Sequence, residues 1–378
     1  MSVDSWGGVI AYSQFDTTDY QFRLAVIRGG VQELLPVAAQ SVPFDLDVGP
    51  GPDGKPTLVY ARCPIATGSP YATGCDLYRY SLSTAAEAPI AGANTSSEEV
   101  APSIWKDEIA FVRTQSPFPR PGVMPHFYTR PLERPDVRST RVDVMPTKEC
   151  RSGYCRKTTY GTVDETELHG SRLAAVVHAG PGTVDAPNVE VRLVDHGKAT
   201  SVANTAVGAI SVRKAFIGLS FEDDGILSFA RSFFYASPDA VYRYDIAKQR
   251  YTSSPLPRMT YGLAANGHGR YLRLATCTPD CPAIPPQPGS TLGAPGPLPL
   301  NLTRTDQLRF GSARPPAADA DGDRGAPARH NPRRVARRLG ATRSTSRVGR
   351  PVLPVEPVDA RGVEVGGHGH AQRREEPI

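Results

Sequence analysis

The chain has 378 residues, 35 of them Gly and 37 Pro, so these two types make up about one residue in five, against roughly one in eight in an average protein. Long helices are therefore not expected, while a hydrophobic content of 39% provides for a folded core and excludes a wholly disordered chain. The formal net charge is +5, and no apolar run approaches the roughly 18 residues of a membrane-spanning helix.

A pair of short strands recurs along the first 275 residues. Six apolar strands are predicted at Val9–Tyr12, Thr57–Ala61, Glu108–Val112, Arg172–Val177, Gly225–Ala230 and Arg270–Ala275. Five are followed, after a loop, by a strand with alternating large side chains, at Gln21–Val26, Cys75–Tyr80, His126–Arg130, Glu190–Val194 and Ala240–Asp245. Only the sixth apolar strand lacks an evident partner.

The spacing of these copies predicts an all-β fold, a six-bladed β-propeller. Successive copies lie roughly 45 to 65 residues apart, which fits propeller blades with loop insertions. Turn residues such as Pro52-Asp53-Gly54 precede several apolar strands, so each is expected to be the second or third strand of its blade. The last blade is expected to be incomplete, or closed by a strand from the N-terminal segment or from Asp306–Phe310.

The chain changes character after Phe310. Residues 311–378 contain 13 Arg, no Lys, 8 acidic residues, no aromatic residue and no Cys. We therefore expect a propeller domain at 1–310 and a disordered tail at 311–378, because the tail has too little apolar surface to offset chain entropy. The tail accounts for the +5, so the body is near neutral and is not expected to bind nucleic acid.

Three interpretations of the tail remain open. It is an Arg-rich arm for acidic partners, a linker, or a GC-rich coding sequence translated out of frame, and the last is favoured. Two metal-like motifs in it are rejected. His368-Gly369-His370 is too short, and the calcium-loop pattern beginning at Asp319 has Arg324 in place of the turn Gly and His330 in place of the bidentate Glu.

One stretch carries a family resemblance. Val48–Pro56 leads into Leu58-Val59-Tyr60 and then Cys75–Leu82, and this order of a Pro-Asp-Gly turn, an apolar strand and an Asp-Leu-Tyr strand resembles the TolB-like, WD40-like repeat. Ala101–Trp105 leading into Ile109–Phe111 is a second copy.

The chain is also similar to secreted propeller-like proteins of unknown function from GC-rich actinobacteria. That resemblance implies six blades, export and no particular activity. The location expected is therefore extracellular or in the cell envelope, or cytoplasmic if the start, which carries no export signal, is genuine.

The six cysteines form three close pairs, which favours disulfides Cys63–Cys75, Cys150–Cys155 and Cys277–Cys281 and an oxidising compartment. The alternative is free thiols or a metal site built on Cys150 and Cys155. It is disfavoured because the spacing is not that of a zinc knuckle.

Catalytic motifs are missing from the sequence. It has no Gly-x-Ser-x-Gly elbow, phosphate loop or dinucleotide fingerprint, so no catalytic residue, cofactor or metal is assigned. Five histidines of the body are scattered singly: His126, His169, His178, His196 and His268. His169 stands out because Glu165 and Glu167 precede it, although a solvated polar strand leading into a hairpin at Gly170-Ser171 is favoured. Trp105 is expected to pack within a blade.

Two function classes remain. The first is a monomeric, non-catalytic scaffold that binds a protein, peptide or glycan at one face of the propeller. The alternative is an enzyme, a hydrolase or lyase on a glycan or peptide, whose site is assembled from several blades around the central channel. Carboxylates or imidazoles converging at the channel mouth would favour the enzyme, and an apolar and aromatic rim would favour the scaffold.

Overall fold

The computed structural model describes residues 2–64, 74–114, 125–144, 148–151, 154–157, 160–179, 188–206, 216–223, 225–231, 239–256, 260–265, 271–276, 300–304 and 308–313. The chain divides after Arg324, and the unit formed by residues 325–378 lies wholly outside these ranges. The expected tail is therefore described only at its first three residues. Within the described ranges every regular element is a β-strand, and none of these residues forms a helix that could span a membrane.

Five sheets are built from consecutive antiparallel strands, and we call each a blade. Blade 1 contains β1 (Val3–Trp6), β2 (Val9–Asp16), β3 (Gln21–Arg28) and β4 (Val31–Leu34). Blade 2 contains β5 (Asp45–Pro50), β6 (Pro56–Arg62), β7 (Asp76–Ser81) and β8 (Ala86–Pro89). Blade 3 contains β9 (Glu98–Trp105), β10 (Glu108–Thr114), β11 (His126–Pro131) and β12 (Thr140–Val142).

The remaining sheets follow the same plan. Blade 4 contains β15 (Tyr160–His169), β16 (Arg172–Ala179), β17 (Asn188–Asp195) and β18 (Lys198–Ala206). Blade 5 contains β19 (Phe216–Asp223), β20 (Ile226–Arg231), β21 (Asp239–Asp245) and β22 (Arg250–Leu256), with β26 (Gly311–Ala313) as a fifth strand. A three-stranded sheet contains β23 (Thr260–Ala265), β24 (Tyr271–Thr276) and β25 (Leu300–Arg304), and β13 (Lys148–Arg151) pairs with β14 (Tyr154–Lys157) as a separate hairpin.

The predicted strand pairs are confirmed as the second and third strands of these sheets. The second strands are apolar because the sheet is covered on both faces, and Leu58, Val59, Tyr60 and Ala61 of β6 are fully buried. The predicted turn before β6 is present: Gly54 has a φ of 72°, and the backbone N–H of Gly51 donates to the carbonyl of Lys55.

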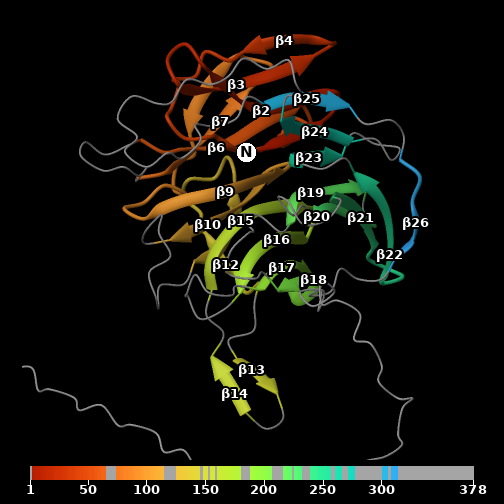
Figure 1. Cartoon of the computed structure of the whole chain (residues 1–378). Coiled ribbons are helices and arrows are strands. Elements are labelled where there is room, and N and C mark those ends of the chain that lie inside the picture. Colours follow the sequence, from red (N-terminus) through yellow and green to blue (C-terminus); the bar gives the residue numbers. More distant parts are fainter. Residues whose placement is uncertain are drawn as a thin grey trace, which may run out of the picture. The chain divides into compact units, whose positions relative to one another are not determined.

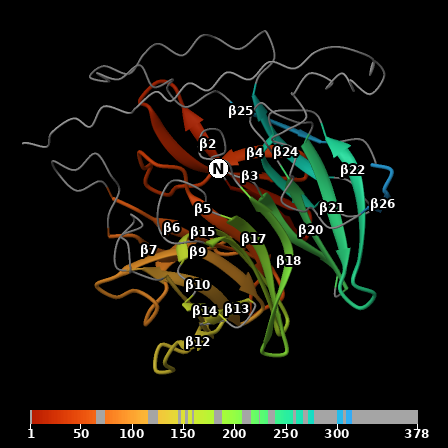
Figure 2. The ribbon, with the colours of Figure 1, turned by 60° about the horizontal axis from the view of Figure 1, so that its bottom comes forward.

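The first strand of each sheet lies innermost. β1, β5, β9, β15, β19 and β23 each contact the next, and β23 contacts β1 in turn. In Figure 1 the N-terminal end lies beside β9 and β23, and Figure 2 shows the same sheets turned so that the bottom of Figure 1 comes forward. The apolar clusters fill the spaces between sheets; one combines Val59 and Leu77 of blade 2 with Ile109 and Phe111 of blade 3. Neither face of a blade could be buried by that blade alone.

The last sheet has three strands in the described part of the chain, which agrees with the expectation that the last repeat is incomplete. The expected closing strands are not found there: its third strand is β25, Leu308–Phe310 form no strand, and the N-terminal β1 belongs to blade 1. Leu308 and Phe310 instead pack against the cluster that contains Tyr271. The next residues form β26, which pairs with β22 and begins directly after the expected domain boundary at residue 310.

Candidate functional site

A small cavity lies between the inner strands, and five of the twelve residues that line it are acidic. Five carboxyl groups reach it from three strands: Asp4 of β1, Asp45 and Asp47 of β5, and Glu165 and Glu167 of β15. The other lining residues are Ser2, Val3, Leu46, Pro102, Thr166, Gly218 and Leu219, so no basic side chain lines it among the described residues. We call these five carboxyl groups the axial carboxylates.

The alternation of a β-strand explains why acidic residues come together here. Asp45 and Asp47 are two positions apart and share one face of β5, and Glu165, Glu167 and His169 share one face of β15. The positions between them are occupied by Leu46, Thr166 and Leu168, all of which are buried.

Each axial carboxylate accepts a backbone N–H from the inner strand of the next blade. Val48 donates to Asp4 Oδ2 at 2.8 Å, and Ile104 donates to Asp47 Oδ2 at 2.6 Å. The remaining bonds are Ala101 to Asp45 at 2.7 Å, Leu219 to Glu165 at 3.1 Å and Phe221 to Glu167. An inner strand is an edge of its own sheet, so its outward N–H groups have no strand partner, and the carboxylates satisfy them.

These bonds also give the direction of the inner strands. Asp45 and Asp47 bond Ala101 and Ile104, and Glu165 and Glu167 bond Leu219 and Phe221, so residue numbers rise together on neighbouring strands. The inner strands therefore run parallel, and their C-terminal residues share one mouth of the ring.

Hydroxyl groups and glycines complete the inter-blade contacts. Thr166 Oγ1 of blade 4 donates to the carbonyl of Ala101 in blade 3 at 2.6 Å and lies 3.1 Å from Ser103 Oγ. A Cβ atom on Gly218, which has a φ of 66°, would lie 2.2 Å from the carbonyl oxygen of Leu263. Only glycine permits this approach of β19 to β23.

Burial and crowding raise the pKa of two axial carboxylates. The pKa of Asp47 is raised well above its usual value, first by burial, then by the charges of Glu167 and Asp4 and by a hydrogen bond with the Asp4 carboxyl. The pKa of Glu167 is also raised, by burial and then by Asp4, against the Phe221 N–H, which lowers it.

The size of the cavity limits what it can hold. Its volume of about 30 Å³ admits about two water molecules. Sites for small organic ligands measure roughly 300 to 1,000 Å³, so no sugar ring or peptide fits among the axial carboxylates. In the described ranges no group of three or more His, Cys, Asp or Glu side chains is arranged to hold a metal ion.

Aromatic rings lie near the C-terminal ends of several inner strands. The Trp105 ring lies 3.6 Å from that of His169 between centroids, and His169 lies 5.4 Å from Phe221. Trp6 ends β1 as Trp105 ends β9, and Lys106 lies over the Trp105 ring at 5.9 Å. We call Trp6, Trp105, His169 and Phe221 the aromatic rim.

The prediction for Glu165–His169 needs correction. The strand does lead into a hairpin at Gly170-Ser171, but it is an inner strand, and Glu165 and Glu167 line the axial cavity instead of facing open solvent. Trp105 packs against an apolar cluster, as expected, and is also part of the rim.

Of the other histidines that the structure describes, His126 and His196 do not join this site. Burial lowers the pKa of His126 on β11, and His196 lies exposed in a turn beside Asp195. The side chain of His178 and all of His268 lie outside the described residues.

Of the expected disulfides, Cys63–Cys75 is present and links the loop after β6 to the start of β7. Cys150 and Cys155 are opposed in the β13–β14 hairpin, but their side chains lie outside the described part of the chain, as do Cys277 and Cys281 entirely.

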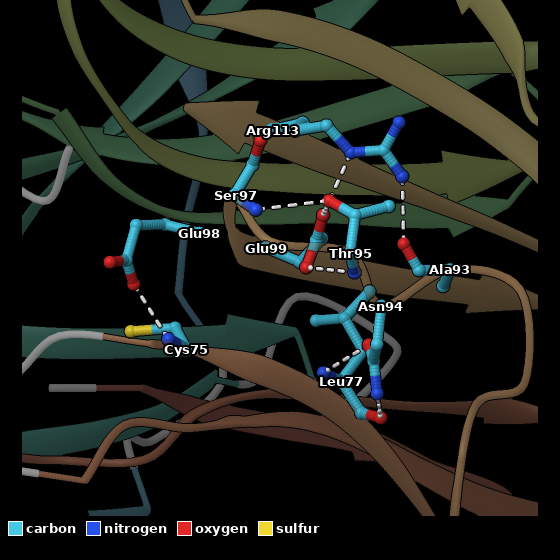
Figure 3. A network of polar contacts seen from close by, with 9 residues as sticks. All are labelled: Cys75, Leu77, Ala93, Asn94, Thr95, Ser97, Glu98, Glu99 and Arg113. Atoms are coloured by element: carbon cyan, nitrogen blue, oxygen red, sulfur yellow. Dashed lines mark hydrogen bonds and ion pairs between the residues drawn. The ribbon is translucent and has the colours of Figure 1, made fainter. Parts of the chain in front are cut away.

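A polar network anchors this disulfide to blade 3 (Figure 3). The Glu98 carboxylate accepts the backbone N–H groups of Gly74 and Cys75, at 2.8 and 2.6 Å. Its neighbour Glu99, fully buried, is paired with Arg113 at 2.7 Å and accepts the hydroxyl of Thr95. Every carboxylate of this network has a structural partner, so the network is not a second candidate site.

Sequence reasoning missed Asp4, Asp45 and Asp47. The available signal was the alternation Asp45-Leu46-Asp47 ahead of a predicted turn and strand, which matches Glu165-Thr166-Glu167 ahead of another. Two acidic residues separated by one position, in the first strand of a repeat, indicate an inner strand. Their carboxylates accept backbone hydrogen bonds from the next blade.

No protein-family model and no curated protein match the sequence. Among solved structures, TolB from Acinetobacter baumannii is 15% identical with a TM-score of 0.42. The match covers 80% of this chain and 65% of that TolB chain. A putative TolB from Agrobacterium tumefaciens is 15% identical with a TM-score of 0.34, covering 53% of this chain and 62% of its own. An oligogalacturonate lyase in complex with manganese is 12% identical with a TM-score of 0.43, and the match covers 73% of this chain and 77% of the lyase. The chain thus spans less than two thirds of either TolB. The blade topology shows an all-β propeller, and the chain is structurally similar to TolB.

Proposed function

We propose that the chain is a six-bladed propeller that acts as a non-catalytic binding scaffold. The three-stranded sheet β23–β25 is taken as the sixth blade, because β23 contacts both β19 and β1 and so occupies the one position left between blades 5 and 1. The scaffold's partner, a protein, peptide or glycan, docks at the aromatic rim. The disulfide Cys63–Cys75 favours an extracellular or envelope location.

The observation that carries this proposal is how the axis is filled. All five axial carboxylates accept backbone N–H groups, and the space between them is about 30 Å³. A glycan or peptide enzyme must bring its reacting groups against a substrate, which needs far more room. The groups best suited to acid–base chemistry therefore hold blades together.

The aromatic rim has the composition of a docking surface. Rigid rings supply large contact areas at little entropic cost, and the half-buried rings of Trp105 and Phe221 rest on well-packed inner strands. Lys106, exposed beside Trp105, adds a positive charge.

A binding screen tests this proposal. The full chain is applied to glycan and peptide arrays, and any ligand found is titrated while the fluorescence of Trp6 and Trp105, the only two tryptophans, is recorded. We expect the double variant K106E/F221A to weaken binding at least about tenfold, the loss of one good contact. The control V31S alters the exposed outer edge of blade 1 and should bind normally. Binding that survives K106E/F221A but is lost in V31S would contradict the proposed face.

The alternative is an enzyme, favoured by the convergence of Asp4, Asp47 and Glu167, since perturbed carboxyl pairs are common in active sites. Assays for hydrolysis and β-elimination of polysaccharides and peptides test it. An activity abolished by D47N or E167Q, with folding intact, would replace the scaffold proposal.

A further inference from the structure

The chain turns back to blade 5 after it has formed the sheet β23–β25. Residues 308–313, which we call the C-terminal strap, come after β25 in sequence, but β26 at their end pairs with β22, the fourth strand of blade 5. Figure 1 shows β26 in blue beside β22. The strap therefore connects one sheet to the outer edge of its neighbour, and it does not complete the sheet that precedes it.

Two apolar side chains of the strap cover the seam between these sheets. Leu308 and Phe310, both half-buried, pack against a cluster that combines residues of blade 5, such as Leu256, with Leu263 and Tyr271 of the sheet β23–β25. The rings of Phe310 and Tyr271 lie 6.2 Å apart between centroids. Without the strap, apolar surface of both sheets would face water along this seam.

A polar layer lies against the Phe310 ring. The Arg243 guanidinium of β21 is 5.1 Å from the centroid of this ring. The same guanidinium donates to both carboxylate oxygens of Glu222, at 2.8 and 2.6 Å, and the Tyr271 hydroxyl donates to that carboxylate at 2.5 Å. The Glu222 side chain is 5% exposed. A guanidinium held at two of its nitrogens presents a fixed plane to the ring, so Phe310 and Glu222 share one anchor.

This anchor also reaches the end of an inner strand. Phe221 of β19 pairs with Leu227 and Asp223 pairs with Ile226, so Glu222 is the extra residue of a β-bulge between the two pairs. A bulged residue is left out of the regular ladder, and its position depends more on its side-chain contacts. The residue before it, Phe221, belongs to the aromatic rim.

The backbone attachment of the strap is short. Gly311–Ala313 pair with Tyr251–Ser253 through three residues, and the strap's side chains there are small and mostly exposed. Three pairs at the outer edge of a sheet open locally at little cost. The ring of Phe310 is therefore the main attachment of the strap.

We propose that the C-terminal strap closes the seam between blade 5 and the sheet β23–β25, and that it holds the end of β19 in place through Arg243 and Glu222. When Phe310 leaves the seam, Arg243 loses the ring beneath it and the bulge at Glu222 is held less firmly. The strap thus links the C-terminal segment of the fold to one ring of the aromatic rim.

Hydrogen exchange of the full-length variant F310A tests the strap. We expect the backbone amides of β22, of β24 and at Phe221–Asp223 to exchange at least about tenfold faster than in the wild type, because the seam opens locally. Amides of β6 and β10 should stay within about twofold of their wild-type rates. The matched control F15A removes another half-buried ring, which packs against Phe22 in blade 1, and should leave β22 and β24 unchanged.

The variants R243Q and F310A/R243Q test the route to β19. Glutamine removes the charge over the ring and can still donate one hydrogen bond to Glu222. If the strap acts through Arg243, exchange at Phe221–Asp223 should be no faster in F310A/R243Q than in R243Q. Additive effects of the two changes there would overturn the proposed coupling. Unchanged exchange in F310A, or an equal rise in every sheet, would overturn the strap itself.

Discussion

The first and second strands of a blade make different kinds of contact, and blade 2 shows the contrast. In β6 every side chain from Leu58 to Ala61 is fully buried against neighbouring sheets. In β5, Asp45 and Asp47 send carboxylates across to the backbone of the next blade. Apolar faces thus supply the burial that stabilises the ring, whereas polar bonds and close backbone approach set how the inner strands fit together at the axis.

Truncating a second strand should have the largest effect. Phe111 of β10 is fully buried in the cluster that joins blades 2 and 3. We expect F111A to lower the free energy of unfolding by about 3 to 5 kcal/mol, from lost burial and the cavity left behind. Urea unfolding measures this, with V31A at an exposed site as the control. A loss below about 1 kcal/mol, the level of surface changes, would mean that this interface contributes little.

A side chain added where two inner strands approach closely should have the second-largest effect on the free energy of unfolding. In G218A a methyl group would meet the carbonyl of Leu263 and the backbone would keep a positive φ, so we expect a loss of about 2 to 4 kcal/mol. G54A separates the two causes: Gly54 has a φ of 72° but nothing within 4 Å of the added Cβ. It should lose only about 1 kcal/mol. Equal losses in the two variants would show that inner-strand contact is not tight.

Removal of a single polar contact between inner strands should lower the free energy of unfolding by a smaller amount. T166V removes the hydroxyl that bonds the Ala101 carbonyl and lies beside Ser103 Oγ, both buried. Valine keeps the shape, and we expect a loss of about 1 to 2 kcal/mol from the unsatisfied polar groups. In T18V, whose site is exposed, the free energy of unfolding should hardly change. A T166V protein as stable as the wild type would make this hydroxyl dispensable.

The contrast between the strands also explains what the sequence could predict. Second strands such as Glu108–Val112 were found because burial on both faces leaves an unbroken apolar run. Inner strands such as Asp45–Pro50 were missed because their partners are backbone N–H groups of another blade, and such a strand then reads as polar loop sequence. Glu165–His169 was predicted as a strand, but its position at the axis was not. Pairing across blades is a property of the closed ring, which no local pattern contains.

The last sheet and the C-terminal segment show a second limit. β25 lies 23 residues beyond β24 in sequence, too far for a hairpin signal, so its pairing with β24 was not predicted. Phe310 was placed at the end of the domain because aromatic residues stop there, and it does pack against Tyr271. The exposed β26 after it has no apolar side chain larger than alanine to reveal it.

Deletion of residues 314–378 should have the smallest effect. The sequence of that segment lacks aromatic residues, so we expect the melting temperature to stay within about one degree while the isoelectric point falls. Any binding to polyanions should disappear with the 13 Arg, since the body is near neutral. A shorter deletion from residue 345 serves as the comparison. Aggregation or a large drop in melting temperature in the longer deletion alone would place part of the fold beyond Ala313.

The most direct test of the axial carboxylates counts the protons released when the chain unfolds at pH 7. Denaturant unfolding is followed calorimetrically in two buffers of different ionisation enthalpy, for the wild type and for D47N. Because burial raises the pKa of Asp47 in the folded chain, the wild type should release more protons on unfolding than D47N. Equal release by the two proteins would show that the pKa of Asp47 is not raised, and the account of the axis would be wrong.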